Sequence, residues 1–205
     1  MVTHQFGARA RFSPAIMRLP LVWGGGAGTA DEVLRYPAGS EMPLVRFSLA
    51  TITERQSTFS DFAGYQRLHV LLQGETELCI GESRRVLSGR FPRTSFSGAE
   101  HTTCQIRQGP VIAWNVVYVG AKTFVEDTVI IAKDDLLEIS PALYRVTLDL
   151  LVGWTPGVSL TAEGETLLLS RGDALIVERA SGDYFPDLRV SGGILVYQRV
   201  HIMEA

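Results

Sequence analysis

The chain has 205 residues, of which 46% are hydrophobic and 20% are charged, and its formal net charge is −3. This composition is typical of a folded globular protein and excludes a disordered chain, which would have fewer apolar residues and more net charge. No cluster of Lys and Arg is present, so we expect no nucleic-acid partner. The sequence shows no secretory signal and no apolar run of membrane-spanning length, so we expect a cytoplasmic protein with no membrane partner.

Short apolar segments separated by 20 glycines and 9 prolines predict many short strands joined by turns. In chain order the strands are expected at residues 44–52, 68–73, 76–80, 111–119, 123–132, 143–152, 158–161, 166–170, 174–178 and 194–201. Two helical turns are expected, at residues 30–34 and at residues 134–138, where acidic residues open the segment. The sequence therefore predicts an all-β fold with very little helix.

The two halves of the chain share a pattern. Residues 70–74 (VLLQG) resemble residues 149–153 (DLLVG), and a short strand follows each segment. A repeat of about eighty residues favours a duplicated β-sandwich unit over a solenoid. We expect an N-terminal half at residues 1–132 and a C-terminal half at residues 133–205, packed as one compact unit. Gly172-Asp173 predicts a tight turn into a buried strand, and this turn resembles one that recurs in cupin jelly rolls.

Three segments resemble the HutD/Ves family in their order and spacing. Residues 23–33 (WGGGAGTADEV) are similar to the family's opening Trp-Lys-Asn-Gly-Gly-Gly signature with its later Thr and Glu. Residues 45–52 (VRFSLATI) are similar to the family's Trp-Arg-Leu-Ser-Ile-Ala strand, and residues 59–67 (FSDFAGYQR) to its Phe-Ser-x-Phe-Pro-Gly-x-Asp-Arg segment. The resemblance covers residues 18–119. It implies a bicupin, that is, two cupin-like jelly-roll barrels without a bound metal, and an accessory or regulatory role linked to histidine degradation.

The chain departs from the family pattern where polar pocket groups are expected. The departures are Gly24 and Gly25 in place of Lys-Asn, Ala27 in the glycine triplet, Gln66 in place of Asp, and Ala113 near the family's conserved asparagine. Either the ligand differs from that of the family, or the pocket has lost its function.

Candidate ligand-binding residues follow from the strand pattern and the resemblance: Arg46, Ser48, Arg67, Asn115, Gly26, Gly28, Thr29, Glu32 and Gln66. Arg46 and Ser48 share one face of a strand, opposite Val45 and Phe47. If the barrel is hollow, Arg46 points inward and can hold a carboxylate through two hydrogen bonds. If the apolar face packs between sheets, each arginine belongs to a surface salt bridge.

The glycine stretch at residues 24–28 allows three interpretations. A phosphate cradle would need the Lys-Ser/Thr of a P-loop, which is missing. A flexible loop would use glycine only for unusual backbone angles. The resemblance favours a loop that crosses the barrel mouth and turns its backbone N–H groups toward a ligand.

No metal and no cofactor are expected. The four histidines, His4, His69, His101 and His201, form no His-x-His motif, and one isolated histidine cannot make a metal site. Cys79 and Cys104 are expected to be buried and reduced.

The leading hypothesis is therefore an accessory protein that binds a small anionic metabolite. The first alternative is a metal-free cupin enzyme, such as an isomerase or epimerase, for which His69 and Glu77 would be the acid–base pair. The second is a structural or interaction cupin whose pocket is filled by side chains. Whether the chain forms a homodimer is left open.

Overall fold

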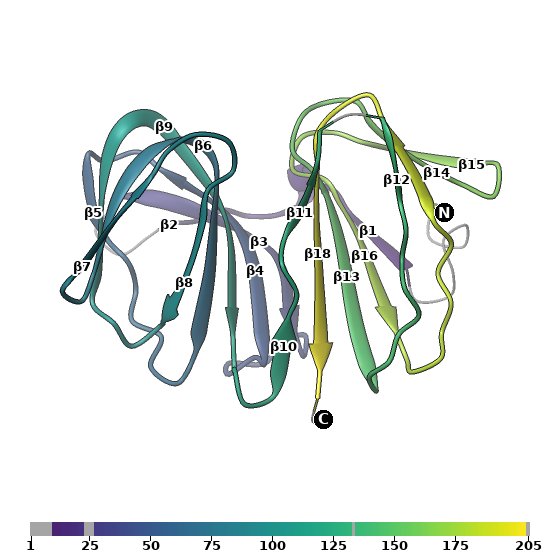
Figure 1. The fold of residues 1–205 in the computed structure, drawn as a ribbon, viewed down its shortest axis with the longest axis horizontal. Helices are drawn as coiled ribbons and strands as arrows, with labels where there is room; N and C mark the ends of the chain where they lie inside the picture. The colour runs from purple at the N-terminus through teal and green to yellow at the C-terminus, as the bar shows by residue number, and fades with distance from the viewer. Residues whose placement is uncertain (1–9, 23–26, 133, 204–205) are drawn as a thin grey trace. The chain divides into compact units, whose positions relative to one another are not determined.

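The computed structural model describes residues 10–22, 27–132 and 134–203, and these are built almost entirely of antiparallel strands (Figure 1). A single 3-10 turn, η1 (Ala15–Met17), is the only helical element in these ranges. No helix in them is long and apolar enough to cross a membrane. The chain divides into two compact units, one of residues 18–121 and the other of residues 1–17 together with residues 122–205. The unit boundary thus falls before residue 132, and the N-terminal strand is grouped with the C-terminal half.

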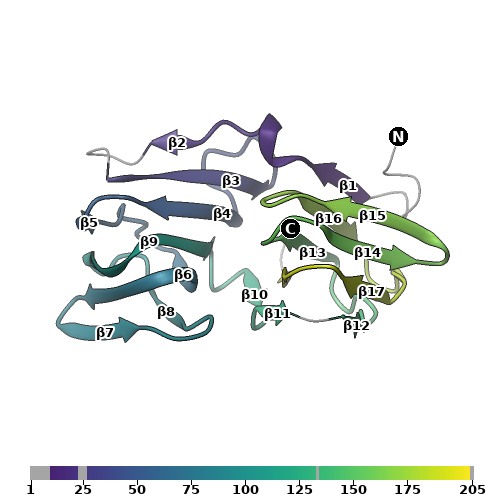
Figure 2. The ribbon, with the colours of Figure 1, turned by 90° about the horizontal axis from the view of Figure 1, so that it is seen from above.

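The unit of residues 18–121, called the first unit below, is built on one eight-stranded sheet. Six strands follow one another across it, in the order β2 (Leu21–Val22), β3 (Gly28–Tyr36), β4 (Val45–Ile52), β9 (Thr102–Tyr118), β6 (Gln66–Ile80) and β7 (Ser83–Leu87). β5 (Gln56–Thr58) pairs with β9, and β8 (Arg93–Ser97) pairs with β6. Figure 2 shows these rows in succession, with β2 at the edge of the sheet.

β6 is a single long strand, although the sequence predicted two strands at residues 68–73 and 76–80. Its first part pairs with β8 and its last part with β7, while β9 runs beside both. The register with β9 shifts around Gly74, which has a φ of 85°. A side chain at Gly74 would lie 2.7 Å from the backbone oxygens of Gln108 and Pro110, so the close approach of the two strands requires glycine.

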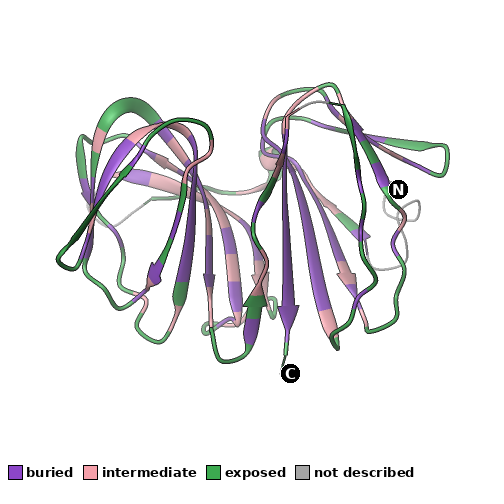
Figure 3. Ribbon diagram, viewed as in Figure 1, coloured by how far each residue is buried: buried purple, intermediate pink, exposed green. Residues whose placement is uncertain are grey.

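The second unit consists of two sheets. The six-stranded sheet contains β1 (Ala10–Ser13), β16 (Ala174–Arg179), β13 (Val146–Gly153), β18 (Leu195–Ile202) and β10 (Thr123–Val125) in that order, with β11 (Val129–Ile131) also paired to β18. The four-stranded sheet contains β12 (Asp135–Leu137), β17 (Leu188–Ser191), β14 (Val158–Ala162) and β15 (Glu165–Leu169). Residues from both sheets form one apolar core, and β13 and β18 are buried along nearly their whole length (Figure 3).

A charged cluster lies within this second unit. The carboxylate of Asp149, which is fully buried, accepts hydrogen bonds from Nε of Arg179 at 2.7 Å and Nε of Arg199 at 2.8 Å. The hydroxyl of Tyr197 donates a third, at 2.5 Å. Burial and the charge of Asp149 raise the pKa of Tyr197 far above its usual range, so this hydroxyl stays protonated and remains a donor.

The predicted turn at Gly172-Asp173 is confirmed. Gly172 has a φ of 84°, and the carboxylate of Asp173 accepts hydrogen bonds from the backbone N–H of Ser170 at 2.9 Å and of Ala15 at 2.8 Å. The second bond ties η1 to the rest of the second unit, because Ala15 and Asp173 are 158 positions apart in the chain.

Both predicted helical turns are wrong. Residues 30–34 lie within β3 and pair with β4, with a bulge between Glu32 and Leu34. Residues 135–137 form β12, in which Leu137 is buried opposite Leu188 of β17. In both segments, sheet pairing satisfies the backbone groups and buries apolar side chains, and these gains outweigh the local preference of acidic residues for the start of a helix.

Candidate functional site

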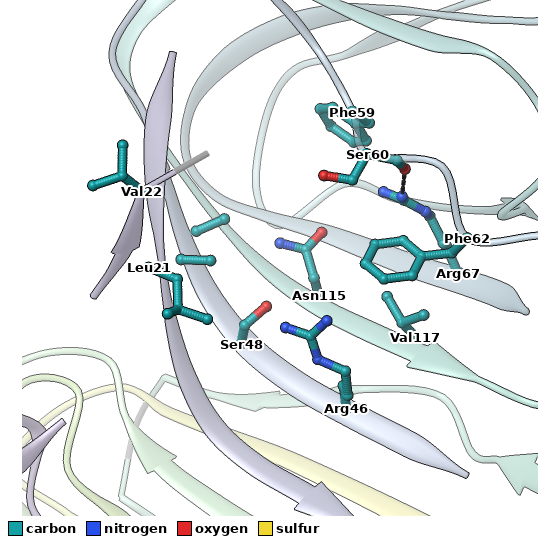
Figure 4. A pocket seen from close by; sticks show the side chains of 12 residues that line it. Leu21, Val22, Arg46, Ser48, Phe59, Ser60, Phe62, Arg67, Asn115 and Val117 are labelled. Atoms are coloured by element: carbon teal, nitrogen blue, oxygen red, sulfur yellow. Dashed lines mark hydrogen bonds between the residues drawn. The ribbon is translucent and has the colours of Figure 1, made fainter. Parts of the chain in front are cut away.

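A cavity of about 230 Å³ lies in the first unit. β2, β3, β4, β6 and β9 contribute to its wall, as does the loop between β5 and β6. The lining residues are Leu21, Val22, Ala30, Arg46, Ser48, Ala50, Phe59, Ser60, Phe62, Arg67, Asn115 and Val117 (Figure 4).

The register of three neighbouring strands brings the polar lining residues together. Asn115 of β9 lies opposite Ser48 of β4 on one side and opposite His69 of β6 on the other. Two residues further along β9 and on the same face, Val117 lies opposite Arg46 of β4 and Arg67 of β6. Two rows of side chains therefore cross the sheet on the cavity face. Strand alternation directs residues 45 and 47 to the other face of β4, where both are fully buried.

Arg46 reaches the cavity with Glu32 beside it. Its Nε donates a hydrogen bond to Oε2 of Glu32 at 2.9 Å, and Arg35 donates to both carboxylate oxygens of Glu32 at 3.0 Å. Burial opposes ionisation of Glu32, but the hydrogen bond from Arg35 and the two positive charges outweigh it and lower the pKa of Glu32. Glu32 is thus an anion that holds Arg46 in place. The ion pair and the inward position of Arg46 occur together, although the sequence presented them as alternatives.

Arg67 is more deeply buried, with only 9% of its surface exposed. Its guanidinium carbon lies 4.7 Å from the ring centre of Phe62 and 5.5 Å from that of Phe59, and Nη2 donates to the backbone carbonyl of Ser60 (Figure 4). Its Nε is buried and has no hydrogen-bond partner among the described residues. Within the same residues, Arg67 forms no ion pair with a carboxylate. Burial lowers the pKa of Arg67 to about 10, with repulsion from Arg46 in the same direction and attraction to Asp61 against it. The guanidinium therefore remains charged at neutral pH.

His69 fixes the orientation of Asn115. Its Nδ1 lies 2.7 Å from Oδ1 of Asn115, and the imidazole is 1% exposed. Burial lowers the pKa of His69 to about 4, and nearby Arg67 adds to this effect while the hydrogen bond to Asn115 opposes it. The ring is therefore neutral at pH 7 and donates through Nδ1–H to the amide oxygen. This leaves the amide N–H groups of Asn115 for the cavity (Figure 4).

The sequence model of the HutD family matches residues 15–192, which is most of the chain and includes every residue of this cavity. The chain belongs to the HutD family. A Pseudomonas putida protein described as an uncharacterized 21.2 kDa protein in the hutC 3′ region is 35% identical over 104 residues, which are 49% of this chain and 53% of that protein. The alignment thus spans about half the length of this relative.

Solved structures of similar fold include HutD from Pseudomonas fluorescens, with a TM-score of 0.74 and 22% identity over 95% of this chain and all of that one. Another is a conserved Pseudomonas aeruginosa protein of unknown function, with a TM-score of 0.77 and 22% identity. That alignment covers 96% of this chain and all of the Pseudomonas aeruginosa chain. The predicted double-cupin fold is confirmed by these and by more distant neighbours.

Four of the residues proposed from the HutD resemblance line the cavity: Arg46, Ser48, Arg67 and Asn115. Glu32 lies behind Arg46, as described above, and Gln66 is exposed at the start of β6. Gly28 and Thr29 belong to β3 and do not line the cavity; a side chain at Gly28 would collide with the carbonyl oxygen of Thr51. Gly26 and the departures at residues 24 and 25 lie outside the described residues.

Sequence reasoning missed the apolar and aromatic part of the lining. Phe59, Ser60 and Phe62 lie in the third segment that resembles the HutD family, so that segment carried a signal for them. Leu21 and Val22 form a two-residue strand, and nothing in the sequence marked them.

The geometry does not support an acid–base pair of His69 and Glu77 or a metal site built on histidines. His69 and Glu77 share β6, but Glu77 is paired with Arg84 and Arg107 at a different hollow of the first unit. His101 is exposed, His201 binds Thr147 and Glu126 in the second unit, and His4 is outside the described residues. In the described ranges no three His, Cys, Asp or Glu residues form a group suited to a metal ion.

Proposed function

We propose that this HutD-family chain binds a small organic carboxylate in the cavity of the first unit and serves as an accessory protein of histidine utilisation. The observation that carries this proposal is Arg67, a buried guanidinium with no carboxylate ion pair in the described part of the chain. An isolated buried charge is costly, and an anion bound in the cavity would offset that cost.

The remaining lining groups suit the same ligand. Arg46, the amide N–H groups of Asn115 and the hydroxyl of Ser48 are all hydrogen-bond donors, and none of the cavity-lining residues in the described ranges is acidic. A carboxylate accepts several hydrogen bonds, and charge-assisted bonds are the stronger kind. The link to histidine utilisation rests on family membership and on the relative described by its position near hutC.

An acid–base enzyme is the second candidate, and the geometry favours binding over it. Catalysis of proton transfer needs a titratable acid and base that face the substrate. Among the described lining residues only the two arginines are ionisable, and Arg67 with its pKa of about 10 stays protonated at neutral pH. A purely structural cupin is also less well supported, because the cavity of about 230 Å³ is not filled by its own side chains.

Calorimetry with a panel of small carboxylates, including the acidic intermediates of histidine breakdown, tests the proposal. We expect one or more of these acids to bind, and the Arg46→Ala variant to bind it roughly ten- to a hundredfold more weakly, because it loses a charged hydrogen bond. The matched control is Arg189→Ala, which removes an exposed arginine of β17 in the second unit and should leave affinity unchanged. The absence of heat with every acid, or an equal loss of affinity in both variants, would contradict the proposal.

A further inference from the structure

Three phenylalanine rings enclose the guanidinium of Arg67. Its central carbon lies 4.7 Å from the ring centre of Phe62, 5.5 Å from that of Phe59 and 5.8 Å from that of Phe96. Phe59 and Phe96 are buried in the core of the first unit, where close packing holds them in place. Phe62 is half-buried, and its ring centre also lies 5.6 Å from the guanidinium carbon of Arg46 (Figure 4). The two arginines of the cavity therefore share the ring of Phe62.

The direction of the Arg67 guanidinium depends on this ring more than that of Arg46 does. Arg46 is also held by Glu32, whereas Arg67 forms no ion pair with a carboxylate within the described ranges. What holds Arg67 is the carbonyl of Ser60 and the attraction between a cation and the faces of aromatic rings, which is larger where water is excluded. Phe62 is the nearest of the three rings, so its position matters most.

The backbone of Phe62 is in turn fixed by Gly98, a residue that follows β8 and does not line the cavity. The carbonyl of Gly98 accepts a hydrogen bond from the N–H of Phe62 at 2.9 Å, and the N–H of Gly98 donates to the carbonyl of Tyr65 at 2.8 Å. The N–H of Tyr65 donates to the carbonyl of Phe62 at 3.0 Å. Both ends of the turn of residues 62–65 are thus bound to one glycine.

A larger residue does not fit in place of Gly98. Its Cβ would lie 2.9 Å from Cβ of Phe62 and 3.0 Å from the carbonyl oxygen of Tyr65, and it would collide with the carbonyl oxygen of Phe62. Two of these atoms belong to the backbone, so a change of side-chain rotamer cannot relieve the contacts. An alanine at this position would therefore push the turn of residues 62–65, and the ring of Phe62 with it, out of place.

We propose that Gly98 and Phe62 are positioning residues of the anion site: Gly98 seats the turn, and the ring of Phe62 then holds Arg67 in the direction that an anion needs. A guanidinium that is already held in place loses little freedom when an anion binds, and this raises affinity. The inference rests on the proposed function and adds two residues that set its affinity, one of them outside the cavity.

Gly98→Ala tests the proposal with two measurements. The first is the Nε–H resonance of Arg67 in heteronuclear NMR spectra of the ligand-free protein, which is assigned by its loss in Arg67→Lys. Ring currents should displace this resonance in the wild type, and in Gly98→Ala it should move toward the position of exposed arginines. The second is a titration with acetate, for which we expect roughly three- to tenfold weaker binding. A variant that is merely less stable would leave the resonance of the folded protein where it is.

Gly153→Ala is the matched control. A methyl group at Gly153 would also press on a backbone oxygen, that of Ser170 at 2.7 Å, but it would do so in the second unit. We expect this variant to be less stable in urea, with the Arg67 resonance and the affinity for acetate unchanged.

Phe62→Leu decides the question if Gly98→Ala does not fold. This variant keeps an apolar side chain and removes the ring, and the same roughly three- to tenfold loss of affinity is expected. Its control is Phe91→Leu, which removes another half-buried ring of the first unit, 5.6 Å from the guanidinium carbon of Arg90, and should leave affinity unchanged.

The outcomes separate this inference from the proposed function. If the Arg67 resonance stays in place in Gly98→Ala, or if Gly98→Ala and Phe62→Leu bind acetate as tightly as the wild type or more tightly, the inference fails while the proposed function stands. An equal loss of affinity in Gly153→Ala also overturns the inference. If the wild type does not bind acetate, the tightest acid of the carboxylate panel takes its place, and if none binds, both proposals fail.

Discussion

Acidification is expected to destabilise the protein through His69. The imidazole is 1% exposed, and burial lowers its pKa from the ordinary 6.5 to about 4. Below pH 6.5 the unfolded chain takes up a proton at this site while the folded protein does not, so the free energy of unfolding falls as the pH falls. The loss is complete near pH 4 and then amounts to about 3 kcal/mol, because each pH unit in this range contributes about 1.4 kcal/mol.

Urea unfolding at pH 7.5 and at pH 5 measures this effect. Over that interval His69 is expected to account for about 2 kcal/mol of lost stability. His69→Gln keeps an amide donor for Asn115 but cannot be protonated, so the variant should lack this part of the loss. His101→Gln changes an exposed histidine of the same unit and leaves His69 in place, so the full loss should persist. Titrating carboxylates are common to all three proteins and cancel in the comparison. Parallel stability curves for the wild type and His69→Gln would refute the reasoning.

Three further predictions concern stability and thiol reactivity. Asp149→Ala is expected to lower the free energy of unfolding by about 3–5 kcal/mol, because it leaves two arginines buried without their carboxylate, and urea unfolding measures the loss. Gly74→Ala is expected to lower the free energy of unfolding by more than the roughly 1–2 kcal/mol expected for Gly164→Ala. Both glycines have a φ of 85°, but only at Gly74 would the new methyl group meet backbone oxygens. Equal unfolding midpoints for the two variants would refute this. Burial raises the pKa of Cys104 to about 11. At pH 8 a thiol reagent is therefore expected to modify the half-buried Cys79 first, and Cys104 only when the protein unfolds. The absorbance of the product that the reagent releases measures both reactions.

The strands could be predicted from the sequence because each is bounded by residues that end a strand, and because side chains alternate within it. The pattern at residues 45–52 placed Arg46 and Ser48 on one face, and the structure puts both on the cavity wall. The helical turn expected at residues 134–138 failed because pairing between β12 and β17 depends on residues about fifty positions further along the chain. A local pattern carries no information about such a partner.

The cavity itself was harder to predict because it depends on register. Asn115 contacts His69 only because β6 and β9 pair in one alignment, with shifts near Gly74 that no periodicity reveals. Arg67 was recognised as a candidate through the family resemblance, but its burial beside Phe59 and Phe62 follows from the fold of the loop before β6.

The placement of β1 has a consequence for any attempt to divide the protein. This strand comes from the first residues of the described chain, yet it pairs with β16, and η1 is anchored to Asp173 nearby. The second unit is therefore discontinuous in sequence, and one cut between residues 121 and 122 would deprive it of an edge strand. Independent folding would require residues 10–17 to be supplied again, either as a separate peptide or joined to the new chain end by circular permutation. Evolution by simple exchange of whole halves is restricted for the same reason.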